Sequence, residues 1–369
     1  MRRYKLVWLC VALALVLVAT SGCTTSKPAQ TEAPKKQEAP AKDPKIARAY
    51  EYSKPGDSRE MPEPPKPDKQ YTIGVALPHL ANPHFVAQAY GYFDEAAKYG
   101  AKVVLFEAGG YANLERQVKQ VEDLIAMPVD AIILVAVNLE GTVPVVDSAA
   151  KAGIPVINVN VMTKNEKVVT RIRSDDEQIG RMHAEYMAKK LNGKGNVLML
   201  DGPAGTTWAM YRAKGFKDYM QQNCPNIKII AERFLDSDPA AGMKEMEDAL
   251  QAYKQIDGVF TGSDFLGVGA AQAIAAAGKA GKIVVTTTDS QDDCIKAIRD
   301  GRITATVVQS STIMGRWGVR AAIWTLQGKA DQLLKQYWTP LTIVDKSNVD
   351  TFNFEGVSRP PAGWKIPTS

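Results

Sequence analysis

The chain has 369 residues, and its 45 Lys and Arg against 40 Asp and Glu give a formal net charge of +5 at pH 7. Three of these positive charges fall within the first five residues, and without them the net charge is +2. No cluster of Lys and Arg remains, which excludes the electrostatic footprint of a nucleic-acid-binding protein. The three histidines have no metal-ligand spacing, so we expect neither a metal site nor a cofactor.

The N-terminus has the layout of an export signal. A basic start runs into an apolar stretch, residues 6–18, which is shorter than the roughly 18 to 20 residues that span a membrane. Residues 19–23 resemble the lipobox of bacterial lipoproteins, although Thr20 stands where an aliphatic residue is usual. We expect residues 1–22 to be a signal peptide and Cys23 to be lipidated; the alternative is an ordinary signal followed by a chance cysteine.

Residues 23–70 have the composition of a linker. Nine prolines, together with Ala, Lys and Glu, leave almost no large aliphatic residues, so this segment cannot form a core. We expect a disordered tether that joins the lipid anchor to the folded part. The alternative is a low-complexity leader without such a role.

The remaining residues, about 300, suit two domains of roughly 150 residues each. Short runs rich in Val, Ile and Leu alternate with helical stretches, which predicts parallel sheets covered by helices. Cys224 and Cys294 both fall here, and the sequence leaves open whether they pair. The expected strands are 71–77, 102–106, 131–135, 155–159, 196–200, 227–231, 258–261 and 283–287, and the expected helices are 83–98, 114–126, 178–191, 207–222, 240–252 and 265–277.

The junction after the first strand contains a strong helix start. Asn82 is a good N-cap, and Pro83 fits the first helical position. In parallel sheets ligands bind beyond the carboxyl ends of the strands, so the free N–H groups of this helix, with His84 and Phe85, would face a cleft. The simpler interpretation is that Asn82 only caps the helix.

A series of motifs resembles the periplasmic sugar-binding proteins of the ribose-binding type. The resemblance covers residues 71–346 and depends on the order and spacing of many motifs, none of which is specific alone. These motifs are residues 73–77, 82–86, 152–157, 174–176 with Gly180, 202–206, Arg212 with 215–216, 263–264, Asp289 and 304–309.

This resemblance implies the type I periplasmic binding protein fold, an α/β fold of two similar doubly wound parallel-sheet lobes joined by a three-segment hinge. We expect the chain to cross between lobes near residues 173–175, 307–310 and 338–340. The expected N-terminal lobe is 71–173 plus 311–337, the C-terminal lobe is 174–310 plus 338–350, and 351–369 form a tail.

The resemblance also implies ligand-binding positions. Asn82, His84 and Phe85 occupy such positions in the first lobe, and Asp289 and Gln309 keep polar residues that receive hydroxyl groups. The family's Asp-Arg pair is replaced by Asn160 and Val161, a second arginine by Met210, an asparagine by Ser263, and an aromatic residue by Ser237. With both arginines gone, we expect a pocket that is not tuned to ribose.

Aromatic side chains offer a replacement for the lost arginines. Trp208 begins a helix of the second lobe, and Tyr111 follows the end of the second strand. The stretch 107–111 is similar to the periplasmic protein that senses trimethylamine N-oxide for a histidine kinase. Because aromatic faces attract cationic groups, the pocket is compatible with an amine oxide, a methylated amine or a less hydroxylated ring.

These features predict an extracytoplasmic solute-binding lipoprotein and not an enzyme. The fold also occurs in sugar-responsive repressors, but those carry an N-terminal helix-turn-helix where this chain has an export signal. We expect a monomer that takes a small polar ligand, such as a sugar, polyol or related compound, and delivers it to the permease of an ABC importer. The alternative is that it reports ligand occupancy to a membrane sensor kinase.

Overall fold

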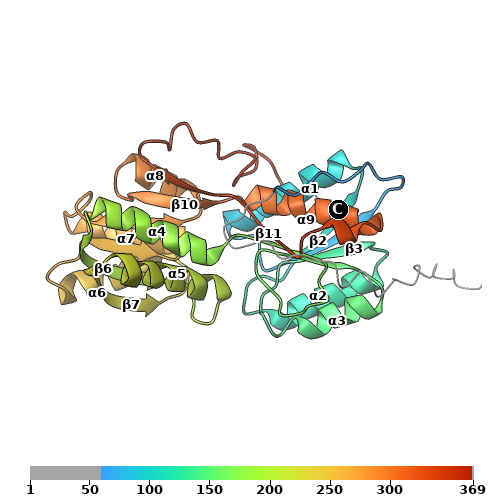
Figure 1. Cartoon of the computed structure of the whole chain (residues 1–369), viewed down its shortest axis with the longest axis horizontal. Coiled ribbons are helices and arrows are strands. Elements are labelled where there is room, and N and C mark those ends of the chain that lie inside the picture. The colour runs from blue at the N-terminus through green and yellow to red at the C-terminus, as the bar shows by residue number, and fades with distance from the viewer. Residues whose placement is uncertain (1–59, 368–369) are drawn as a thin grey trace, which may run out of the picture. The chain divides into compact units, whose positions relative to one another are not determined.

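Two six-stranded sheets organise residues 60–367, the part of the chain that the computed structural model describes. The expected signal peptide and Cys23 lie outside these residues. All described residues belong to one compact unit of the chain. Figure 1 shows that each sheet has helices packed against its faces.

The first sheet has the strand order β11-β5-β4-β3-β1-β2, and all of its strand pairs are parallel. Its strands are β1 (Thr72–Leu77), β2 (Lys102–Glu107), β3 (Ala131–Leu134), β4 (Val156–Val159), β5 (Arg171–Arg173) and β11 (Gln336–Trp338). Its helices are α1 (Pro83–Lys98), α2 (Leu114–Ala126), α3 (Val143–Lys151), α9 (Ser311–Leu326) and the short η2 (Ala330–Gln332).

The second sheet has the order β12-β10-β9-β8-β6-β7, and only the pair of β10 with β12 is antiparallel. Its strands are β6 (Lys194–Asp201), β7 (Asn226–Phe234), β8 (Gly258–Thr261), β9 (Val284–Thr288), β10 (Ala305–Gln309) and β12 (Leu341–Asp345). Its helices are α4 (Asp176–Lys190), α5 (Thr207–Asn223), α6 (Pro239–Ala252), α7 (Asp264–Ala276) and α8 (Asp292–Arg299).

The two sheets repeat one topology, which confirms the predicted fold class. The first five strands of each half lie in the same order, and a sixth strand from the last part of the chain completes each sheet. The chain passes between the sheets three times, after β5, after β10 and after β11. Trp338 differs from the expected boundary, because it pairs with Arg173 and so ends β11 of the first sheet.

Polar side chains begin three of the helices as their sequences suggest. The Asn82 side chain accepts a hydrogen bond of 2.9 Å from the backbone N–H of His84. Asp175 caps α4 in the same way, and Asp238 caps α6 immediately before Pro239. Each cap satisfies backbone donors that the first helical turn leaves free.

Apolar clusters fill both faces of each sheet. Helices α1 and α9 cover one face of the first sheet, and α2 and α3 cover the other. Helices α6, α7 and α8 cover one face of the second sheet, and α4 and α5 cover the other. Glycines let α4 and α5 approach closely, since a Cβ on Gly180 would lie 2.0 Å from the carbonyl oxygen of Arg212.

Residues 60–70, which we expected to be part of a disordered tether, instead pack against α9. Met61 is fully buried in the core of the first lobe. Its carbonyl oxygen accepts a hydrogen bond of 2.9 Å from Arg320, and Trp324 donates one of 3.1 Å to the carbonyl of Pro62. The tether prediction fails here because it judged composition alone, whereas one buried methionine and the backbone carbonyls attach this stretch.

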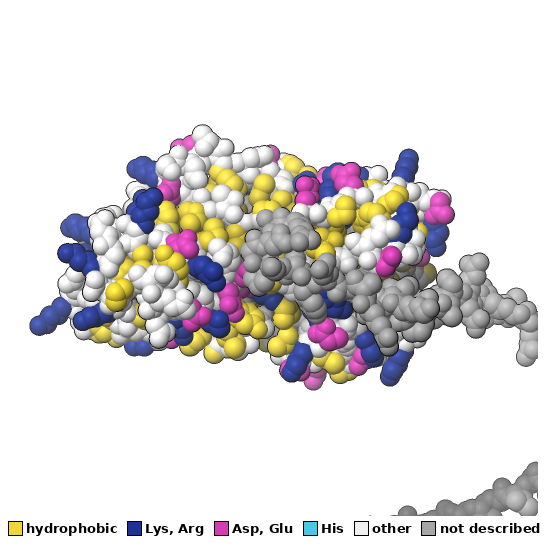
Figure 2. Space-filling view, viewed as in Figure 1, with side chains coloured by type: hydrophobic (Ala, Val, Ile, Leu, Met, Phe, Trp, Pro, Cys, Tyr) yellow, Lys and Arg dark blue, Asp and Glu magenta, His cyan; other side chains and the backbone are white. Residues whose placement is uncertain are grey.

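Several smaller features of the described residues bear on the chemistry of the chain. Cys224 and Cys294 are separate, buried free thiols. His183 is a packing residue, buried against Phe260 and hydrogen-bonded to Thr288. Within residues 60–367, no helix has the length and apolar composition needed to cross a membrane. On the face in Figure 2, basic side chains stand mostly at the outer edges, with acidic side chains among them.

Met61→Ala tests whether residues 60–70 belong to the folded domain. Removing a fully buried methionine side chain should lower the free energy of unfolding by about 2 kcal/mol or more, measured by urea denaturation. Lys66→Ala is the control, because Lys66 is exposed in the same stretch. Equal unfolding midpoints for the two variants would show that this stretch does not contribute to the core.

Candidate functional site

A cavity of about 360 Å³ lies at the carboxyl ends of strands from both sheets. The structure brings all nine predicted ligand-binding residues to its wall. These are Asn82, His84, Phe85, Tyr111 and Asn160 from the first lobe, and Trp208, Ser263, Asp289 and Gln309 from the second. The remaining lining residues are His79, Val161, Pro203, Thr206, Arg212, Asp236, Ser237 and Phe265.

A second, larger hollow of about 660 Å³ lies on the other side of His84, Asp289 and Gln309. Residues from the end of the chain form much of its wall. Only those three of the nine predicted residues line it. The smaller cavity is therefore the candidate ligand site, because it collects the strand ends where parallel sheets bind ligands.

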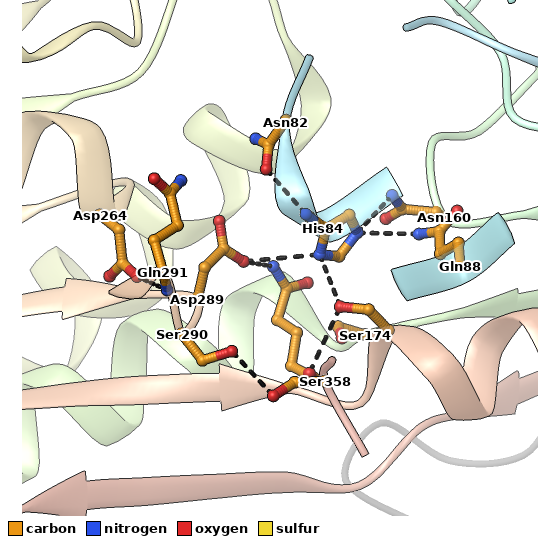
Figure 3. A network of polar contacts seen from close by, with 12 residues as sticks. Asn82, His84, Gln88, Asn160, Ser174, Asp264, Asp289, Ser290, Gln291 and Ser358 are labelled. Carbon is orange, nitrogen blue, oxygen red and sulfur yellow. Dashed lines mark hydrogen bonds and ion pairs between the residues drawn. The ribbon is translucent and has the colours of Figure 1, made fainter. Parts of the chain in front are cut away.

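His84 is the centre of a polar network that joins the two lobes (Figure 3). Its Nε2 lies 2.9 Å from the amide nitrogen of Asn160 and 2.8 Å from that of Gln88. Amide nitrogens only donate, so Nε2 is the acceptor of these contacts. Nδ1 contacts the Ser311 hydroxyl at 2.8 Å and stands 3.6 Å from the Asp289 carboxylate.

Asp289 adopts a backbone conformation that side-chain-bearing residues rarely take. Its φ is 104°, and Asn160, another residue of the cavity, has a φ of 60°. Such positions cost of order 1–3 kcal/mol each and often mark functional sites. The Thr306 hydroxyl donates a hydrogen bond of 2.7 Å to the Asp289 carbonyl, and the Asp289 N–H donates one of 3.1 Å to the carbonyl of Val307. These bonds hold the carboxylate at the cavity.

The carboxyl groups of Asp289 and Asp264 are neighbours whose pKa values are shifted in opposite directions. Burial alone would raise the pKa of Asp289, but the nearby His84, Arg212 and Gln309 side chains outweigh it and hold that pKa below its usual value. Burial, together with the charge of Asp289, raises the pKa of Asp264. Asp264 accepts from Thr287 and from the N–H of Gln291. Of this pair, Asp289 lines the cavity and is therefore the carboxylate that stays ionised.

Three rings form an aromatic wall on the first lobe. Phe85 packs edge to face against His79, with ring centroids 5.0 Å apart, and against Tyr111 at 6.4 Å. Burial raises the pKa of the Tyr111 hydroxyl and lowers the pKa of His79. Both rings are thus uncharged at neutral pH, and the wall offers apolar faces and edges to a ligand.

On the second lobe, Trp208 and Arg212 form a stacked pair. They lie four residues apart on α5, and the guanidinium carbon is 5.0 Å from the centre of the indole ring. Arg212 also donates a hydrogen bond of 3.0 Å to Asp176 and one of 2.8 Å to the carbonyl of Gly262. Because Arg212 is 95% buried and doubly bonded, its position is fixed. The positive charge of the Arg212 guanidinium therefore already lies beside the indole ring.

Arg212 is the main lining residue that the sequence interpretation did not assign to the site. Met210, where we expected the loss of a ligand-binding arginine, is half exposed and does not line the cavity. The arginine two positions later does line it. The helical spacing of Trp208 and Arg212 could have revealed this, because residues i and i+4 share one face of a helix.

The cavity holds no arrangement suited to a metal ion. Among residues 60–367, no group of three or more His, Cys, Asp and Glu side chains lies close enough to ligate one. Its chemistry is that of hydrogen bonding and ring stacking: the carboxyl groups of Asp289 and Asp236, several amides and hydroxyls, one fixed guanidinium and an aromatic wall.

A cavity between two parallel-sheet lobes, lined by side chains of both, is the arrangement of a two-lobe solute-binding protein. The chain belongs to the periplasmic binding protein family, whose domain matches residues 73–330. The predicted ribose-binding-type membership is confirmed. This family comprises extracytoplasmic substrate-binding proteins of ABC importers and not enzymes, as the sequence predicted.

Several relatives are similar over most of their length. The ribose import binding protein RbsB of Bacillus subtilis is 32% identical, with 74% of this chain and 90% of that protein covered. The xylitol-binding protein of Mycolicibacterium smegmatis is 31% identical over 75% of this chain and 78% of its own. A Bacillus halodurans solute-binding protein with bound myo-inositol has a TM-score of 0.70 and 27% identity, covering 76% of this chain and 96% of that one.

Gly202→Ala tests the placement of Trp208. A Cβ at Gly202 would lie 2.0 Å from Cη2 of the indole, so the ring must move. We expect a loss of about 1–3 kcal/mol in the free energy of unfolding, measured by urea denaturation. The same change in a Trp208→Ala background is the control and should cost much less. Equal costs in both backgrounds would contradict this packing.

Proposed function

We propose that this protein captures a sugar or polyol in the 360 Å³ cavity and delivers it to an ABC importer. The observation that carries the proposal is the ionised Asp289 carboxylate, fixed opposite an aromatic wall. Hydroxylated rings and chains match this combination, since they offer hydroxyl donors at their edges and C–H groups on their faces.

Each side of the cavity has a role in this binding mode. Asp289 accepts ligand hydroxyls in charge-assisted hydrogen bonds, which are about twice as strong as neutral ones. Gln309 donates a hydrogen bond of 2.6 Å to the Asp289 carboxylate and orients this carboxylate. Asn82 and Asn160 supply further amide groups, and Phe85 contacts the apolar face of the ligand.

The relatives support a hydroxylated ligand but span several kinds. The protein from Mycolicibacterium smegmatis is named for xylitol, and the Bacillus halodurans structure contains myo-inositol. In this chain Val161 replaces an expected ligand arginine and lines the cavity as an apolar residue. A polyol or less hydroxylated ring therefore suits the cavity better than ribose, since an arginine donor is replaced by an alkyl group.

The alternative ligand, an amine oxide or methylated amine sensed on behalf of a histidine kinase, is supported by the aromatic wall. The position of Arg212 weighs against a cationic methylamine, because its positive charge already stacks on Trp208. An amine oxide keeps an acceptor oxygen that Arg212 could meet. Import is favoured because an ionised carboxylate and surrounding amides match several hydroxyl groups better than one oxide.

We include a lipid anchor at Cys23 in the proposal. The apolar stretch 6–18 and the small residues before Cys23 support it. Cys23→Ser should abolish incorporation of labelled palmitate in the native bacterial host and move the protein from membranes to the soluble exported fraction. Cys224→Ser is the control and should remain labelled. Persistent labelling of Cys23→Ser would rule out the anchor.

A ligand screen tests the proposed binding. Thermal-shift measurements with pentoses, hexoses, cyclic polyols, methylamines and N-oxides should reveal a stabilisation that grows with ligand concentration, about 2.7 kcal/mol at one hundred times the Kd. For the responding compound, Asp289→Asn should weaken binding at least tenfold, because it removes a charged acceptor while keeping a side chain that tolerates this backbone conformation.

Asp293→Asn is the matched control, because Asp293 is exposed on α8 and does not line the cavity. A polyol response that Asp289→Asn leaves unchanged would contradict the site. A response restricted to N-oxides would favour the sensing alternative.

A further inference from the structure

The end of the chain, after β12, lies across both lobes. Residues 352–364, here called the C-terminal strap, contact the second lobe first and α1 of the first lobe last. Figure 1 draws the end of the chain in dark red, passing from the region of α8 toward the first lobe. These residues lie beyond the matched family domain, which ends at residue 330.

On the second lobe the C-terminal strap is firmly attached. Phe352 and Phe354 pack against the apolar core of this lobe. The Ser290 and Ser358 hydroxyls are hydrogen-bonded at 2.7 Å. The Arg359 guanidinium donates a hydrogen bond of 2.8 Å to the carbonyl of Ser290 and forms an ion pair of 2.5 Å with Asp292.

On the first lobe the C-terminal strap has two anchors. Near the hinge, the N–H of Thr312 donates 2.9 Å to the carbonyl of Val357, and Arg316 donates 3.1 Å to that of Gly356. Farther along, the Trp364 ring packs edge to face on Tyr90 of α1, with centroids 5.4 Å apart, and also contacts Phe93. Neighbouring strap residues thus bind different lobes.

The C-terminal strap also lies directly behind the ligand cavity. It lines the 660 Å³ hollow, which shares His84, Asp289 and Gln309 with the cavity. Its partner Ser290 follows Asp289 in the chain, as Figure 3 shows through the contact of Ser290 with Ser358. A movement of the C-terminal strap relative to α8 would therefore shift Ser290 and with it the adjacent Asp289, whose carboxylate accepts hydrogen bonds from the proposed ligand.

The length of chain between Arg359 and Trp364 limits how far the lobes can separate while the contacts of both residues hold. Five Cα–Cα steps lead from Arg359, on the second lobe, to Trp364, on the first. A fully extended chain spans at most about 3.3–3.6 Å per residue, or about 17 Å over this stretch. The hinge crossings are joined to one another by side-chain hydrogen bonds, such as that of 2.7 Å from the Ser310 hydroxyl to the carbonyl of Pro340. The strap adds an aromatic contact between the lobes that a wide opening must break.

We infer that the C-terminal strap is a latch that restrains lobe opening, with Trp364 as its releasable end. In the latched state the lobes stay near the arrangement that forms the ligand cavity, so less ordering is required when ligand binds. Release of Trp364 from Tyr90 lets α1 move away from α8 and opens the route to the cavity. This inference holds whichever ligand the cavity takes.

The test measures lobe separation directly, without ligand. Spin labels at Lys119→Cys on α2 and Lys244→Cys on α6 report the distance between the lobes by pulsed electron resonance, in the chain from residue 23 onward with Cys23→Ser, which lacks Cys10. The two remaining thiols, Cys224 and Cys294, are buried. Trp364→Ala should increase the long-distance population about two- to tenfold, the usual worth of one aromatic pair.

Two further variants define the result. Trp364→Phe keeps an aromatic contact and should restore most of the native distribution, whereas Phe234→Ala, which removes an exposed aromatic ring of the second lobe, should leave it unchanged. Circular dichroism confirms that each variant is folded. A Trp364→Ala distribution equal to the native one overturns the inference, as does an equal increase in Phe234→Ala.

Discussion

The contact between Asp289 and the side chains around it is the constraint on which the site depends. A residue with a φ of 104° stays in place only because Thr306 and Val307 hold its backbone and because His84 and Gln309 surround its carboxylate. His84 belongs to the first lobe, so the strained residue of one lobe is supported by the other. The ligand cavity, the polar network and the rear hollow all share this carboxylate.

Local signals in the sequence predicted much of this arrangement. The Asn82-Pro83 pair placed the start of α1 at the residue where the structure has it, because capping depends on neighbouring residues only. The alternation of apolar runs and helical stretches predicted four strands of each sheet, β1 to β4 and β6 to β9, but not β5, β10, β11 and β12. The nine candidate residues meet in one cavity because parallel strands bring the loops after their carboxyl ends to one edge.

The features that the sequence did not predict depend on contacts between distant segments. Met61 looks like a lone apolar residue in a proline-rich stretch, and only the α9 surface makes it part of the core. The end of the chain likewise has no repeated pattern, yet Trp364 finds Tyr90 more than 270 residues earlier in the sequence. Arg212 was noted for its position in a motif, but its fixed place at the cavity depends on its hydrogen bonds to Asp176 and to the carbonyl of Gly262.

The attachment of residues 60–65 to α9 decides which lobe a tethered protein would hold fixed. The hydrogen bonds of Arg320, Trp324 and Gln327 to this stretch join the incoming chain to the first lobe alone. A linker pulled from the membrane side would therefore load the first lobe, and the load would reach the second lobe only through the hinge and the C-terminal strap. With the first lobe held by the proposed anchor, ligand capture would be a swing of the second lobe toward a stationary partner.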